Sequence, residues 1–188
     1  QLSMAVVMYV SDHGYYPPTI FFPKFSPYTP TVGVWKCPSN KNIEALPGMT
    51  FGLSYGYNAW GVLGDLGGDP FDLGLERHPL MSESQVVSPS QMISIGDGFQ
   101  EVDGEIYSLT NFYGVIGMNF LNAWGLKPEE LSELARQARG RHSSRSSVGF
   151  CDGHVESARF VELFAWKDEV LRRWNSDNLP HAERKQFR

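Results

Sequence analysis

Three residues near the end of the chain have side chains that can bind zinc. His142, Asp152 and His154 offer two imidazoles and a carboxylate, and an Asp-Gly turn could bring two of them together on a β-hairpin. Each residue also has a structural explanation. Asp152 suits the turn, His154 suits a half-exposed strand position, and His142 can hold the loop that enters the hairpin by a hydrogen bond. We expect the structural roles and no metal at these residues.

A second group of potential metal ligands, three carboxylates, lies in a glycine-rich segment. Asp65, Asp69 and Asp72 stand among the glycines of this segment. Calcium prefers several oxygen ligands on a flexible backbone, but the spacing here is not that of an EF-hand loop. We therefore expect a solvated loop and no cofactor, with calcium as the alternative.

The motifs of common enzyme classes are absent from the sequence. It contains no Gly-x-Ser-x-Gly elbow and no His-Glu-x-x-His helix, and the glycines at 61–68 lack the Lys-Ser/Thr ending of a phosphate loop. The serines beside His142 lack the positional pattern of a nucleophile and its base. These absences favour a protein that is not an enzyme.

The two cysteines, Cys37 and Cys151, are far apart in the sequence. Two cysteines exclude a four-cysteine zinc site and leave either two buried thiols or one disulfide. A disulfide that closes so long a loop would stabilise the fold by roughly 4 kcal/mol. Both alternatives remain open from the sequence.

Size and charge predict one soluble domain. The chain has 188 residues and a formal net charge of -5, from 16 basic and 21 acidic residues without a long block of either sign. This distribution does not predict binding to nucleic acid or to an anionic membrane. No stretch approaches the roughly 20 apolar residues of a transmembrane helix.

The N-terminal half predicts one helix and two strands. Residues 1–13 are helix-forming but begin without a capping residue, as if a longer helix had been cut, and Gly14 can form the left-handed C-terminal cap. Alternation over 51–60 predicts a strand. A second strand is predicted within 92–98, ended by the Asp97-Gly98 turn.

The C-terminal half predicts two helices and a hairpin. A helix is expected over 127–139 inside an insertion at 104–140, and another from about Arg159 to Trp174. The hairpin spans 142–158 with Asp152 and Gly153 as a two-residue turn, which would pair Phe150 with Val155 and bury both. The expected fold is α+β, an N-terminal helix packed on an antiparallel sheet with additional C-terminal helices.

Several segments together resemble a known family. His142, nine residues and then Asp152-Gly153 resemble the prepilin-type processing-associated His-x9-Asp-Gly family of bacterial pseudopilins. The Trp-Lys-Cys-Pro-Ser run at 35–39 and the Ser-Tyr-Gly-Tyr-Asn run at 54–58 are similar to two further segments of that family. The N-terminal helix with the turn that follows it and the ending at 174–181 also agree.

The resemblance implies a single pilin-like domain over 1–188, with 1–13 as the remnant of a long N-terminal helix. It implies a non-catalytic subunit of a pilus-like filament or a type II secretion pseudopilus. The partners would be other pilin or pseudopilin subunits, reached through the N-terminal helix. The subunit would be anchored in the inner membrane before assembly and would act in the cell envelope or outside the cell. His142, Asp152 and Gly153 would fix the hairpin.

Two other functions remain as alternatives. A secreted module that binds a glycan or a peptide would use aromatic rings as a platform. The candidate rings are Tyr15, Tyr16, Trp35, Tyr55, Tyr57, Trp60, Tyr113 and Trp124. A zinc or calcium hydrolase would need at least three convergent ligands and an open coordination position.

Overall fold

The computed structural model describes residues 1–17, 26–29, 31–39, 54–58, 61, 73–75, 79–97, 100–102, 105–107, 142–165 and 167–185. The helix expected over 127–139, most of the insertion at 104–140 and the acidic residues Asp65, Asp69 and Asp72 lie outside this part. None of the helices within these ranges has the length and apolar character needed to cross a membrane.

The first element is helix α1, Leu2–His13, which ends where the sequence predicted. Gly14 has a φ of 74° and its N–H donates to the carbonyl of Val10, which is the expected left-handed cap. The inner face of α1 repeats at helical spacing and packs on the sheet. Its buried residues are Leu2, Ser3, Ala5, Val6, Tyr9 and Val10.

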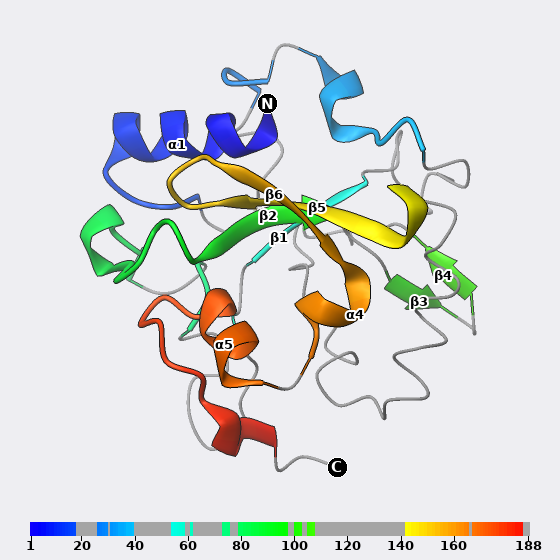
Figure 1. Ribbon diagram of the computed structural model, residues 1–188. Coiled ribbons are helices and arrows are strands. Elements are labelled where there is room, and N and C mark those ends of the chain that lie inside the picture. The colour runs from blue at the N-terminus through cyan, green and yellow to red at the C-terminus, as the bar shows by residue number, and fades with distance from the viewer. Residues whose placement is uncertain are drawn as a thin grey trace.

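An antiparallel sheet of four strands lies against α1, so the fold class is α+β. The strand order is β1 (Tyr55–Tyr57), β2 (Ile93–Asp97), β5 (Arg145–Phe150) and β6 (Val155–Arg159). A separate hairpin is formed by β3 (Gln100–Val102) and β4 (Glu105–Tyr107). Figure 1 shows α1 on one side of the sheet and the C-terminal helices on the other, which explains why every residue of β2 is buried.

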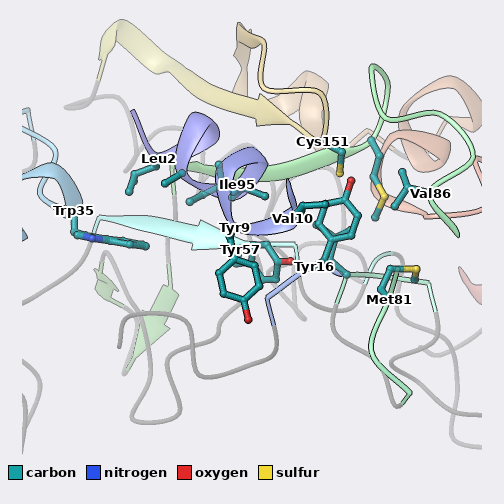
Figure 2. Packing of buried hydrophobic residues seen from close by; sticks show 14 residues of the cluster. Leu2, Tyr9, Val10, Tyr16, Trp35, Tyr57, Met81, Val86, Ile95 and Cys151 are labelled. Carbon is teal, nitrogen blue, oxygen red and sulfur yellow. The ribbon is translucent and has the colours of Figure 1, made fainter. Parts of the chain in front are cut away.

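The core between α1 and the sheet is rich in aromatic residues. Figure 2 shows Tyr9 and Tyr57 close together beneath the helix, Trp35 to one side of them, and Tyr16 extending toward Cys151. The side chains of Trp35 and Tyr57 are at most 2% exposed. Because Trp35 is buried in this core, the residues that follow the 3₁₀ helix Val32–Trp35, including Cys37, lie beside the core.

The hairpin turn is one residue longer than predicted. Phe150 N–H donates to the carbonyl of His154, and Gly153 N–H donates to the carbonyl of Phe150. Gly153, with a φ of 94°, is the only turn residue in the left-handed region, as in a three-residue loop with a glycine bulge. The expected pairing of Phe150 with Val155 is therefore wrong, since Val155 pairs with Gly149 and is 60% exposed.

The helix predicted from Arg159 to Trp174 is also wrong as one continuous element. The chain forms α4 (Phe160–Leu163), α5 (Asp168–Leu171) and a 3₁₀ turn, Arg172–Trp174. The reason is the indole of Trp174, whose N–H donates to the carbonyl of Leu163 at 3.1 Å. In one helix these residues would be about 16 Å apart, at 1.5 Å per residue.

Helix α1 lies close against β5 at Gly149. A Cβ added there would lie 2.7 Å from Ser3 Oγ and 3.2 Å from Ile95 Cγ2. Ser3 Oγ–H also donates to the carbonyl of Gly153 at 3.0 Å, which ties the helix to the hairpin loop. The absence of a side chain at Gly149 thus sets the distance between helix and sheet.

We predict that Gly149→Ala lowers the free energy of unfolding by about 1–3 kcal/mol, because α1 must move away from β5 to admit the methyl group. Urea unfolding monitored by tryptophan fluorescence measures this loss. The matched control is Gly33→Ala, where the nearest atom to an added Cβ is 3.5 Å away, so the change should be close to neutral. Equal effects of the two substitutions would contradict the close approach of α1.

Candidate functional site

Three potential metal ligands meet at one end of the two central strands of the sheet, and we call Cys37, Asp97 and His142 the Cys-Asp-His cluster. Cys37 follows the 3₁₀ helix Val32–Trp35, Asp97 is the last residue of β2, and His142 lies just before β5. Their ligand atoms all lie within 4.8 Å of one another. Antiparallel pairing of β2 with β5 places Asp97 beside Ser147, whose N–H donates to its carboxylate, and the turn His142–Ser144 before β5 brings the ring of His142 to the same place.

The contacts within the cluster converge on one nitrogen. Cys37 Sγ is 3.1 Å from His142 Nε2, and Asp97 Oδ1 is 3.7 Å from the same atom. The Asp97 side chain is fully buried, whereas that of His142 is 32% exposed. The cluster therefore has a buried side and a side that faces solvent.

The loop that carries His142 has an unusual backbone. His142, Ser143 and Ser144 have φ values of 46°, 56° and 68°. Each non-glycine residue in this region costs roughly 1–3 kcal/mol, so contacts elsewhere must hold the conformation. The contacts of His142 with Cys37 and Asp97 are part of that restraint. They take the place of the backbone hydrogen bond that the sequence suggested for His142.

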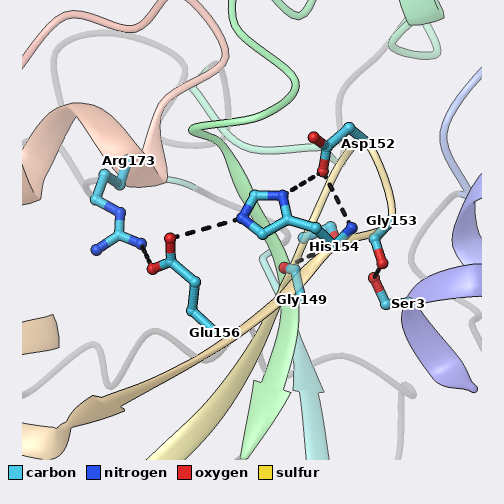
Figure 3. A network of polar contacts seen from close by, with 8 residues as sticks. Ser3, Gly149, Asp152, Gly153, His154, Glu156 and Arg173 are labelled. Carbon is cyan, nitrogen blue, oxygen red and sulfur yellow. Dashed lines mark hydrogen bonds and ion pairs between the residues drawn. The ribbon is translucent and has the colours of Figure 1, made fainter.

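The structure brings Asp152 and His154 together but places His142 elsewhere. The six residues of β5, about 20 Å of extended chain, lie between His142 and the hairpin loop. His154 Nδ1 lies 2.6 Å from Asp152 Oδ1, and His154 Nε2 lies 3.6 Å from Glu156 Oε1. Figure 3 shows the ring of His154 between the two carboxylates. Glu156 pairs in turn with Arg173. These exposed polar contacts contribute little to stability individually.

Both cysteines are free thiols, so of the two alternatives left by the sequence the structure contains the buried thiols. Cys37 lies in the Cys-Asp-His cluster, whereas Cys151 lies in the hairpin loop near Tyr16 (Figure 2). The pKa of Cys151 is raised to about 12, mainly by burial; the hydrogen bond with Tyr16 lowers it in part, and the nearby charge of Asp152 raises it. Burial is also the main cause of the raised pKa of Tyr16.

The raised pKa of Cys151 predicts a loss of stability in alkaline solution. In the unfolded chain this thiol ionises with the ordinary pKa of 9.0, whereas in the folded protein it stays neutral to a higher pH. Its contribution to the free energy of unfolding is therefore fully present below pH 9 and is lost as the pH rises toward 12. We expect the reduced wild-type protein to lose about 1 kcal/mol more than Cys151→Ala between pH 8 and pH 10. Urea unfolding at both pH values measures this difference. Parallel losses in the two proteins would contradict a buried, neutral Cys151.

Sequence reasoning missed Asp97 as a member of the cluster and considered Cys37 only for a disulfide. In the sequence, Asp97 stands at the end of a predicted strand and next to a glycine, and an Asp-Gly pair there is explained by a turn. Burial of the Asp97 carboxylate would have indicated a functional site more strongly. That burial arises because both faces of β2 are covered, which the sequence alone does not reveal. The neighbours of Asp97 come from sequence positions 60 and 45 residues away.

The segments that carry the family resemblance contact one another in the structure. Cys37 N–H donates to Ser54 Oγ at 2.9 Å, and Cys37 Sγ meets His142. The Asn58 side-chain amide donates to the carbonyl of Trp174 at 2.8 Å. No family model, no curated protein and no solved structure matches this chain.

Proposed function

We propose that this chain is the non-catalytic head of a filament subunit, in a pilus-like filament or a type II secretion pseudopilus. The observation that carries the proposal is the position of α1, which lies along the antiparallel sheet with one face buried and an apolar row outside. Met4 and Met8 form this row, one helical turn apart, and are 54% and 46% exposed.

The methionine row is suited to a second copy of the chain. Residues four apart lie on the same helix face, so Met4 and Met8 present one continuous apolar strip. A hollow of about 200 Å³ adjoins the strip and is lined partly by Tyr28 and Val34. Covering this surface removes apolar area from water, which is the driving force for subunits that pack through their N-terminal helices. The proposal is thus a pilin-like fold in which α1 is the assembly surface.

Contacts between the segments that resemble the pseudopilin family give further support. Segments 35–39, 54–58, 142–153 and 174–181 are far apart in the sequence but are linked by the contacts of Cys37, Asn58 and His142 described above. Segments that form one connected region of a fold have a shared structural reason to occur together. Under this proposal the partners are further pilin-like subunits, and the subunit acts in the cell envelope or outside the cell.

The methionine row gives a direct test in the cells that make the protein. We expect Met4→Glu with Met8→Glu in the full-length protein to abolish filaments, because two carboxylates would have to be buried at each contact. The isolated domain should stay within about 0.5 kcal/mol of the wild type, since both side chains are exposed.

The matched control places the same charge on exposed apolar residues elsewhere, Val87→Glu with Leu179→Glu. This control should assemble as the wild type does. Normal filaments from the Met4 and Met8 variant would contradict assembly through α1.

Of the two alternatives, the metal-dependent hydrolase has the more specific observation in its favour. The Cys-Asp-His cluster supplies three convergent ligands with one side toward solvent. The rings that motivated a glycan or peptide module are, where the structure describes them, largely core residues. Tyr16, Trp35 and Tyr57 are at most 2% exposed, and Tyr15 and Tyr55 are partly buried.

A further inference from the structure

We propose that Cys37, Asp97 and His142 bind one zinc ion, a property that goes beyond filament assembly and does not depend on it. In a tetrahedral zinc site with ligands about 2.0–2.3 Å from the metal, the ligand atoms lie about 3.5 Å from one another. Two of the three separations in the cluster, 3.1 Å for Cys37 Sγ to His142 Nε2 and 3.7 Å for His142 Nε2 to Asp97 Oδ1, lie on either side of that value, and all three ligand atoms lie within 4.8 Å of one another.

The geometry distinguishes a metal site from a catalytic thiol. In a nucleophile–histidine–carboxylate arrangement the nucleophile contacts one ring nitrogen and the carboxylate orients the ring through the other. Here the thiol and the carboxylate both face Nε2 of His142. Convergence of a sulfur, an oxygen and a nitrogen on one point is what a metal ion requires.

The ligand types select zinc over the hard cations. A thiolate and an imidazole are softer ligands than calcium or magnesium prefers, whereas both are usual ligands of zinc. Asp97 completes the set with a carboxylate that is fully buried. Asp97 already accepts a hydrogen bond from Ser147 N–H, and a cation beside this buried carboxylate would interact with it more strongly than in water.

Backbone contacts hold two of the ligands in place. Ser147 N–H donates to Asp97 Oδ2 at 2.7 Å, which directs the carboxylate along β5. Ser54 Oγ accepts from Cys37 N–H, and Ser54 N–H donates to the carbonyl of Trp35, so the residue just before β1 fixes the segment that carries Cys37. Such surrounding hydrogen bonds orient ligands and raise metal affinity.

Because His142 is partly exposed, a water molecule could occupy the fourth coordination position of the zinc ion. Cys37 and Asp97 lie on the buried side of the cluster, and His142 forms its solvent side. Three protein ligands with a water as the fourth is the usual arrangement of a zinc site that stays accessible. The ion would join three segments, the one after Val32–Trp35, the end of β2 and the loop before β5.

The test titrates zinc chloride into chelator-treated, reduced protein and measures binding by calorimetry and metal content by elemental analysis. We expect one zinc per chain, and at least tenfold weaker binding for His142→Gln, which removes a ligand from the exposed side without creating a cavity in the core. Cobalt(II) in place of zinc should give a thiolate-to-metal charge-transfer band in the wild type that Cys37→Ser lacks.

The matched controls are His154→Gln in the hairpin and Cys151→Ser at the other buried thiol. Both should bind zinc as the wild type does. The proposal is overturned if the wild type takes up no stoichiometric zinc, if its cobalt complex lacks the thiolate band, or if folded His142→Gln binds zinc with wild-type affinity. Loss of binding in His154→Gln with retention in His142→Gln would assign the metal to the hairpin instead.

Discussion

Asn58→Asp should destabilise the domain by about 3–5 kcal/mol, although the two side chains have almost the same shape. The side chain of Asn58 is fully buried, and its NH₂ group donates to the carbonyls of Ile93 and Trp174, both at 2.8 Å. A carboxylate in this position would turn both hydrogen bonds into contacts between acceptors and would bury an unpaired charge. The substitution therefore affects β1, β2 and the C-terminal segment together.

Urea unfolding at neutral pH measures this effect. The matched control makes the same amide-to-carboxylate change at an exposed position, Gln91→Glu, and should alter stability by no more than about 0.5 kcal/mol. A loss below about 1 kcal/mol for Asn58→Asp would contradict the two donated hydrogen bonds.

Trp174→Ala should lower the free energy of unfolding by about 3–5 kcal/mol. The indole is fully buried, donates to the carbonyl of Leu163, and lies 5.3 Å from the ring of Phe164. Its removal would leave a large cavity and an unsatisfied carbonyl between the two short C-terminal helices.

The control for Trp174→Ala is Leu179→Ala, because Leu179 is an apolar residue of the same segment but is 55% exposed. This control should change stability by less than about 0.5 kcal/mol. Comparable losses in the two variants would show that the C-terminal segment does not pack through Trp174.

The sequence predicted those elements whose formation depends on residues close to one another along the chain. The end of α1 at Gly14 followed from a glycine after an apolar helical repeat, and β2 followed from an apolar run before an Asp-Gly pair. The hairpin was predicted from Asp152 and Gly153, but its register was not. The same dipeptide fits a two-residue turn or the last two positions of a three-residue loop, and these differ by one residue in pairing.

Elements that depend on distant contacts could not be predicted in this way. The helical repeat over 159–174 is real, but the hydrogen bond from Trp174 to Leu163 requires the chain to fold back on itself. The Cys-Asp-His cluster depends on which strands are neighbours, since Cys37, Asp97 and His142 come from three parts of the chain. Spacing along the sequence favoured His142 with Asp152 and His154, which β5 separates.

The central claim, assembly into a filament, is tested most directly by electron microscopy of the full-length protein in its own cells. An antibody raised against this domain would label the thin sections and the cell surface. We expect label along filaments or at secretion foci. Diffuse label in the periplasm or the medium, from a mature protein without an apolar helix, would contradict the account and favour a secreted binding module.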